Sequence, residues 1–172
     1  MVTDNNAGDT ASPQTGRNED ATAQGAAFTL DHANARYDRG FAAHLGFEFL
    51  EWEPDRAVLG LEIQDWHLNL AGVLHGGILA SLLDIAGAAA GSYCPYPGRI
   101  RKAITLSMTT TFTGQASGGH VRAIGRRRAG GSRIFNSSVD IVDAHDRLLA
   151  MGEGTYRLRS GCEGPEGIPI DA

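Results

Sequence analysis

The sequence predicts an α+β domain in which a mostly antiparallel sheet wraps one buried helix. Between residues 78 and 90 the chain carries a single charge, Asp84, among apolar and small residues, which is typical of a helix buried on nearly all sides. Residues 103–112 alternate with a period of two, which is the clearest strand signal in the chain. Short turns join the last four predicted strands, and such turns favour antiparallel pairing. A helix that is apolar all round needs a surrounding surface, so we expect the sheet to enclose it.

Before this helix the chain predicts another helix and a hairpin. Residues 28–44 place apolar side chains near helical spacing, which indicates one amphipathic helix ending at Gly46. Pro54 and the residue after it form the turn between strands expected at 47–52 and 57–63.

A loop at 64–72 leads into the central helix, which we expect to reach about residue 93, before Pro95 and Pro97 break the chain. The remaining strands are expected at 103–112, 120–126, 134–142 and 148–158, with turns at 129–132 and 143–146.

The length predicts one domain with residues to spare. Residues 1–26 hold almost no large apolar side chain, so we expect a disordered N-terminal tail. The folded domain is predicted at residues 27–159. Residues 160–172 contain Gly and Pro and are predicted to form a loose C-terminal tail.

Charge and hydropathy argue against several classes of protein. The net charge of −5, with no basic cluster beyond residues 126–128, argues against nucleic-acid binding. The sequence contains no run of about 18 apolar residues, so it predicts no membrane span. No secretory signal is visible either, so we expect a cytoplasmic protein. Cys94 and Cys162 lack metal-ligand spacing and the six histidines are scattered, so we expect no metal, no cofactor and no structural disulfide.

His75, Gly76 and Gly77 stand at the start of the buried helix, where unpaired N–H groups and the helix dipole suit a developing oxyanion. Asp84 lies eight residues after Gly76, about 12 Å along the helix axis. A reacting carbon must lie about 3 Å from both the oxyanion donor and the nucleophile, so one helix cannot supply both. A second copy, packed antiparallel, would bring Gly76 beside the partner's Asp84. The alternative is an ordinary core helix whose Asp84 bonds a nearby backbone group.

The other candidate residues each have a structural explanation beside the functional one. Asn69 could hold a water or a carbonyl oxygen, or shape a turn. His75 could donate to a substrate or cap the helix, and Thr105 could face the site or the strand surface. The basic run 126–128, with Arg133, could capture phosphate groups or be a solvated strand end. No nucleophile-elbow serine, phosphate-binding loop or dinucleotide motif is present.

The spacing of Asn69, His75-Gly76-Gly77 and Asp84 resembles that of the hotdog-fold acyl-CoA thioesterases of the phenylacetate-pathway (PaaI-like) type. The strand at 104–112 and the ending Gly152-Glu153-Gly154-Thr155-Tyr156 add to this resemblance. The resemblance covers residues 41–159. It implies an antiparallel sheet wrapped around a long central helix, and homodimers that usually pair into tetramers. It also implies a site across the dimer interface, in agreement with the spacing of Gly76 and Asp84.

The resemblance also assigns roles by position. Gly76 looks like the oxyanion-hole N–H, and the partner's Asp84 like the catalytic carboxylate. Asn69 and His75 resemble the pair that positions substrate and water, and Thr105 falls where related enzymes carry a hydroxyl that holds the water. The region near the CoA nucleotide corresponds to Arg127, Arg128, Ser132 and Arg133.

We therefore expect an enzyme that hydrolyses an acyl-CoA thioester to free acid and CoA, with Asp84 as nucleophile or general base. Two alternatives remain open: a hotdog hydratase or dehydratase, which would need a paired Asp and His, and a non-catalytic acyl-CoA-binding or sensing protein. The acyl group is not defined by the sequence.

Overall fold

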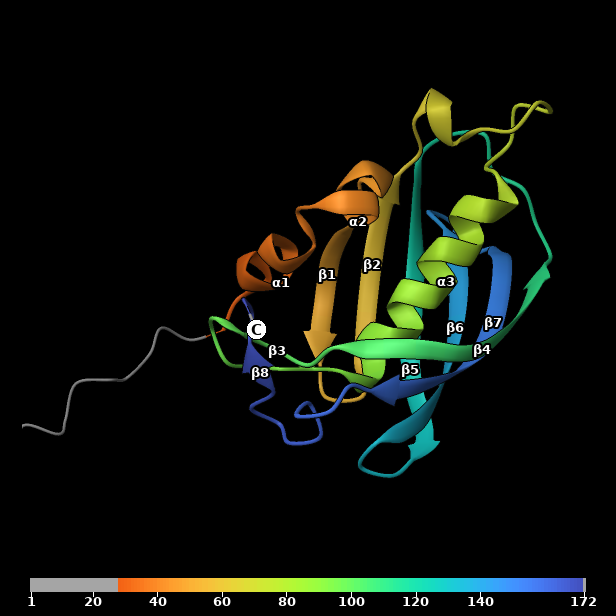
Figure 1. Cartoon of the computed structure of the whole chain (residues 1–172). Helices are drawn as coiled ribbons and strands as arrows, with labels where there is room; N and C mark the ends of the chain where they lie inside the picture. The colour runs from red at the N-terminus through yellow and green to blue at the C-terminus, as the bar shows by residue number, and fades with distance from the viewer. Residues whose placement is uncertain (1–27, 172) are drawn as a thin grey trace, which may run out of the picture.

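The computed structural model describes residues 28–171, so the tail expected at residues 1–26 lies outside the described residues. Six antiparallel strands form one sheet in the order β1-β2-β5-β6-β7-β4, and α3 lies across one face of it (Figure 1). This is the predicted hotdog architecture. Its elements are α1 (Leu30–Tyr37), α2 (Gly40–Leu45), β1 (Glu48–Glu53), β2 (Arg56–Glu62), a short 3₁₀ turn (Asp65–His67), α3 (Gly76–Gly91), β3 (Arg99–Ile100), β4 (Ala103–Phe112), β5 (His120–Gly130), β6 (Ile134–Asp143), β7 (Leu148–Leu158) and β8 (Ile168–Pro169).

The core lies between α3 and the sheet. Leu79, Leu82, Leu83 and Ala86 of α3 are buried against inward-facing residues of the strands. Small residues allow the close approach: a Cβ added to Gly125 of β5 would lie 2.3 Å from the carbonyl oxygen of Ala86. The helix therefore rests directly on the sheet backbone at this point.

One stripe of α3 is not covered by the sheet. Gly77 is exposed, and Ser81, Asp84, Ile85 and Ala88 are half-buried. The sequence predicted a helix buried on nearly all sides, and this part of the prediction is wrong for the single chain. The uncovered stripe carries the only charged residue of the helix.

The N-terminal helical segment is two helices rather than the single helix predicted. The break falls after Tyr37, where Gly40 adopts a left-handed backbone with φ +61°. The second helix ends at Gly46, as predicted, with φ +75° at the C-cap.

The C-terminal segment also differs from the loose tail that the sequence predicted. Strand β8 pairs with β3, and Cys162 is fully buried. Arg99 donates to the carbonyl oxygens of Glu166 and Gly167, each at 2.7 Å. Charge-assisted bonds to backbone carbonyls hold this segment without a regular apolar pattern, which is why the composition did not reveal it.

The turn between β5 and β6 is shorter than predicted. Strand β5 continues to Gly130, which takes φ +138°, and only residues 131–133 connect it to β6. Cys94 and Cys162 are both free and buried. No helix among residues 28–171 has the length and apolar character to cross a membrane.

Candidate active site

The start of α3 presents one backbone donor to the outside. His75 is the N-cap, and its Nδ1 accepts a hydrogen bond from the N–H of Gly77 at 2.8 Å. The N–H of Gly76 donates to no acceptor among the described residues. Because His75 uses Nδ1 as an acceptor, the neutral ring carries its proton on Nε2 and presents a donor.

A buried histidine fixes the loop that leads to this helix. His67 accepts from the N–H of Gln64 at 2.9 Å through Nδ1 and donates from Nε2 to the carbonyl oxygen of Leu45 at 3.1 Å. The N–H of His75 in turn donates to the carbonyl oxygen of His67 at 2.9 Å. The helix start is thereby tied to the end of α2, a role that the sequence did not reveal.

Asn69 shapes the turn just before the helix. Its Oδ1 accepts from the N–H groups of Ala71 at 2.9 Å and Val73 at 3.4 Å. This supports the structural explanation for Asn69. Its side-chain amide nitrogen has no partner among the described residues, so it is available as a donor beside the helix start.

Asp84 stands in the middle of the uncovered stripe and is held from β4. The hydroxyl of Thr105 donates to Oδ1 of Asp84 at 2.5 Å. A β-bulge between Thr105 and Ser107 makes this contact possible. Without it, Thr105 and Ser107 would share one face of the strand; with it, Thr105 faces α3 and Ser107 faces away. The alternation read from the sequence therefore does not continue through Leu106.

The structure does not bring Gly76 and Asp84 together within one chain. Both lie on the same unbroken 16-residue helix, eight positions apart, so about 12 Å separates them along the axis. We call the N–H of Gly76 and the carboxylate of Asp84 the two candidate half-sites of the chain. One chain cannot place a single carbon about 3 Å from both groups, so chemistry that uses both would need a second chain.

Sequence comparison places this arrangement in a known family. The sequence model of the protein family described as "Thioesterase superfamily" matches residues 71–150, which include the helix start, Asp84 and Thr105. A Mycobacterium tuberculosis protein, provisionally named an esterase, is 31% identical over 114 residues, which are 66% of this chain and 81% of the relative. The chain belongs to the thioesterase superfamily.

Solved structures agree with this family assignment. A thioesterase from Haemophilus influenzae superimposes on this thioesterase-superfamily chain with a TM-score of 0.69 and 24% identity, covering 77% of this chain and 91% of the other. A variant of the phenylacetic acid degradation protein PaaI from Thermus thermophilus gives a TM-score of 0.59 and 29% identity, covering 68% and 96%.

The four residues expected to meet CoA do not form one group in this superfamily member. Arg127 is engaged: it donates to the carbonyl oxygen of Gly131 at 3.0 Å, lies 3.4 Å from Asp55 and covers the ring of Phe135. It therefore ties two turns together. Ser132 is exposed in the β5–β6 turn.

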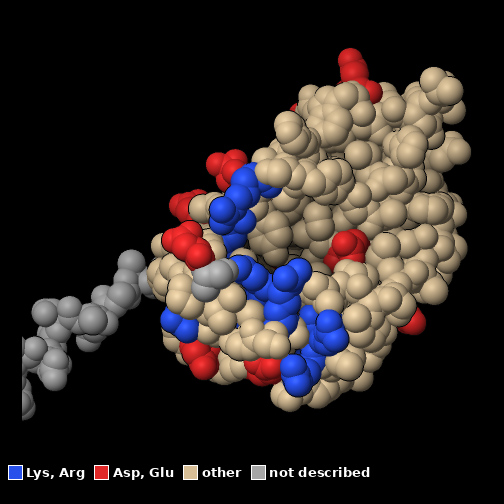
Figure 2. All heavy atoms as spheres, in the orientation of Figure 1, with Lys and Arg blue, Asp and Glu red and all other residues tan. Residues whose placement is uncertain are grey.

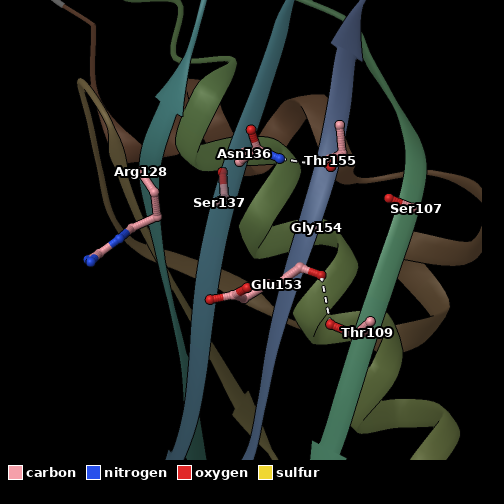
Figure 3. A pocket seen from close by; sticks show the side chains of 8 residues that line it. All are labelled: Ser107, Thr109, Arg128, Asn136, Ser137, Glu153, Gly154 and Thr155. Atoms are coloured by element: carbon pink, nitrogen blue, oxygen red, sulfur yellow. Dashed lines mark hydrogen bonds between the residues drawn. The ribbon is translucent and has the colours of Figure 1, made fainter.

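Arg128 borders a polar hollow of about 370 Å³ on the side of the sheet turned away from α3 (Figure 3). Asn136 donates to Thr155 there at 2.8 Å, and the main-chain carbonyl of Glu153 accepts from Thr109 at 3.5 Å. Asp84 and Gly76 are not among its lining residues. This hollow is separate from the two half-sites.

Arg133 lies elsewhere, in a cavity of about 570 Å³ with Ile104, Arg157 and Arg159. Figure 2 shows Lys and Arg side chains gathered on this end of the molecule. Ile104 directly precedes Thr105 on β4, so the cavity lies at the same end of this strand but on the face opposite to Thr105 and Asp84. Arg157 and Arg159 were not predicted from the sequence; Arg157 lies near the end of β7 and Arg159 directly after it, and both line this cavity.

Potential metal ligands are not gathered in the described part of the chain. Across residues 28–171, no group of three or more His, Cys, Asp or Glu side chains is arranged to hold a metal ion.

Proposed function

We propose that the protein is a cytoplasmic acyl-CoA thioesterase that works as a homodimer, with two sites that each combine Gly76 of one chain with the partner's Asp84. The observation that carries the proposal is the pair of half-sites on α3: an unpaired N–H at the helix start and a carboxylate about 12 Å away. Membership of the thioesterase superfamily supports thioester hydrolysis as the reaction class.

The surface around Asp84 supports a second copy of the chain as the missing half. Strand β4 is an edge of the sheet, so one side of its ten residues is unpaired. Leu106 and Phe112 on this strand are exposed by 49% and 53%, and Leu70 at the loop tip is fully exposed. A partner that pairs along β4 and covers the open stripe of α3 would bury these side chains. Pairing of two such dimers into a tetramer remains a prediction.

In the composite site the thioester carbonyl oxygen accepts from the N–H of Gly76, which stabilises the negative charge that develops on it. The partner's Asp84 attacks the carbonyl carbon directly, or removes a proton from a water that attacks. Both routes break the carbon–sulfur bond and release the CoA thiolate, which takes up a proton. When water attacks, the free acid forms in the same step; when Asp84 attacks, the acyl group is left on its carboxylate as an anhydride, which a water then hydrolyses to the free acid and the regenerated Asp84. Thr105 orients the carboxylate.

His75 favours hydrolysis over the hotdog hydratase alternative. A hydratase or dehydratase would need a basic imidazole nitrogen paired with the carboxylate. Nδ1 of His75 already accepts from Gly77, so the ring presents an N–H to the site rather than a base. We assign His75 and the amide of Asn69 as donors to substrate or water.

We assign the CoA phosphates to the cavity lined by Arg133, Arg157 and Arg159. Arginine forks match phosphate oxygens, and of these three residues only Arg133 has an ion pair, with Glu163 at 3.3 Å. In this proposal the cavity takes the place of Arg127, which is bonded to Gly131 and Asp55, and of Arg128, which borders the separate polar hollow.

A panel of acyl-CoA esters, assayed by thiol release, tests the function. Wild-type protein should release free CoA, and Asp84→Asn, which keeps the volume and removes the charge, should release none while still binding the ester. Binding without turnover in both proteins would instead indicate the sensing alternative. Formation of an enoyl-CoA from a β-hydroxyacyl ester would indicate a dehydratase.

The phosphate assignment has its own test. The double variant Arg157→Gln/Arg159→Gln should raise KM for CoA esters far more than for pantetheine thioesters, which lack the nucleotide. Arg122→Gln is the matched control, since Arg122 pairs with Asp146 at the other end of β5. Equal KM changes on both substrates would reject the assignment.

A further inference from the structure

Two hydroxyl groups in the described core, those of Tyr156 and Ser137, are buried without a hydrogen-bond partner. A buried hydroxyl with no partner costs free energy, so such a group needs a reason. Tyr156 is fully buried, and its ring stacks on Phe135 with centroids 5.3 Å apart. A phenylalanine would keep this packing and avoid the orphaned hydroxyl. Packing alone therefore does not explain a tyrosine at this position.

Two glycines leave the space that the Tyr156 hydroxyl fills. A Cβ on Gly87 of α3 would lie 2.0 Å from the phenol oxygen, and a Cβ on Gly154 of β7 would lie 2.4 Å from it. Gly87 follows Asp84 by three residues, so the two positions share one face of α3, with Cβ positions about 5–6 Å apart. The phenol hydroxyl therefore lies within one helical turn of the carboxylate.

The sheet brings the same two groups together from the other side. Tyr156 of β7 is the direct cross-strand partner of Thr105 of β4, and Thr105 holds Asp84 through its hydroxyl. Burial raises the pKa of the Tyr156 phenol, and the negative charge of Asp84 raises it further. The phenol thus keeps its proton at any pH where the protein works, and it can only serve the carboxylate as a donor.

We propose that Tyr156 is a positioning residue for Asp84: its buried hydroxyl stabilises the ionised carboxylate from beneath α3 while Thr105 holds it from the edge of the sheet. The inference rests on the proposed function, because it concerns the carboxylate that performs the hydrolysis. A donor dipole close to a carboxylate favours its charged form. Several other ionisable groups on the helix side of the sheet lie towards the far end of α3: Arg101 and Arg127 are beside Gly91, and Arg36 donates to the carbonyls of Cys94 and Tyr96. Asp143 is paired with Arg147 at the end of β6. In the proposed dimer, His75 at the start of the other copy's helix also faces Asp84.

Tyr156→Phe tests this role because it removes one oxygen and keeps the ring. We expect kcat to fall about tenfold with KM unchanged, because the charged carboxylate loses the hydroxyl dipole beside it. Tm should stay the same or rise, because the core loses an unpaired polar group. Unchanged kcat, or a change confined to KM or Tm, would overturn the proposal.

Ser137→Ala is the matched control, since it removes the second orphaned hydroxyl from the same core. Its kcat should equal that of the wild type, and a loss as large as that of Tyr156→Phe would overturn the specific role of Tyr156. Asp84→Asn separates this inference from the proposed function. If Asp84→Asn retains activity, the catalytic assignment itself fails; if it is inactive and Tyr156→Phe is fully active, only the role of Tyr156 fails.

Discussion

The two ends of α3 are built in opposite ways. At its C-terminal end, Trp52 donates to the carbonyl oxygen of Ala89 at 2.9 Å, and Arg36 donates to those of Cys94 and Tyr96 at 3.1 and 3.0 Å. Arg101 donates to three further carbonyls, two of them in the C-terminal segment. Polar groups at this end find partners within the chain.

At its N-terminal end the same helix is left incomplete. The N–H of Gly76 has no partner among the described residues, Gly77 is exposed, and the loop before it carries a fully exposed Leu70. With the proposed function, the difference becomes a division of roles: the C-terminal end would supply stability, and the N-terminal end would keep donors free for a substrate and a partner chain. Substitutions at the two ends should therefore affect different observables.

The largest expected effect is at Gly76. Replacing it by Pro removes the N–H, and kcat should fall about 10²–10³-fold, as for loss of an oxyanion donor. The fold should tolerate Pro because Gly76 is the first helical residue, its Cβ would meet Phe112 at an ordinary 3.6 Å, and His75 before it is extended. Gly76→Ala keeps the N–H and is the matched control. Steady-state kinetics with circular dichroism decide the matter: a fully active Gly76→Pro variant would remove Gly76 from the site.

A change at the C-terminal end should do the reverse. Arg36→Met removes the charge that bonds the buried carbonyl of Cys94 and the partly buried carbonyl of Tyr96, and that stacks on Phe28 and Trp52. We expect a loss of about 2–4 kcal/mol in the free energy of unfolding, since two charge-assisted bonds are lost and the Cys94 carbonyl stays buried. Denaturant titration measures it, with exposed Arg39→Met as the control. The folded Arg36→Met variant should keep wild-type kcat, and a kcat loss without destabilisation would contradict the division between the two ends.

The smallest expected effect lies away from both ends, at Asp143. Partial burial acts to raise its pKa, but hydrogen bonds from Arg147 and from the N–H of His145 outweigh it and hold the pKa at about 2, against an ordinary 3.8. The folded pKa is lowered, so this stabilisation is present above pH 3.8 and is lost as the pH falls towards about 2. Asp143→Asn should therefore unfold more easily than wild type at neutral pH, and the difference should shrink below pH 3.8. A difference that is constant across this range would contradict the assignment.

The sequence predicts most of the fold because its signals are local. The period of two in β4 gives the bounds of that strand, and the turn residues place the hairpins. Features that depend on the conformation or on distant contacts of the folded chain could not be predicted from the sequence. The break at Gly40 needs a left-handed backbone that composition does not reveal, and the C-terminal segment is held by arginines that are distant in sequence.

The candidate site divides in the same way. The helix start and Asp84 stand out from their sequence context, so the amino-acid sequence alone predicts both candidate half-sites. The position of Thr105 depends on a bulge at Leu106, for which the alternating sequence gives no signal. The relation of Tyr156 to Asp84 depends on the strand pairing and on two glycines, so it is visible only in three dimensions.

The most direct test of the central claim, that each site needs two chains, is complementation between two inactive variants. Asp84→Asn and Gly76→Pro each leave both sites of a homodimer broken. In a mixed dimer one site carries both lesions and the other carries neither. Co-refolding equal amounts should restore up to about a quarter of wild-type activity, since half of randomly paired dimers are mixed and each has one intact site of two. No recovery from folded dimers shown to be mixed would mean that each site belongs to a single chain.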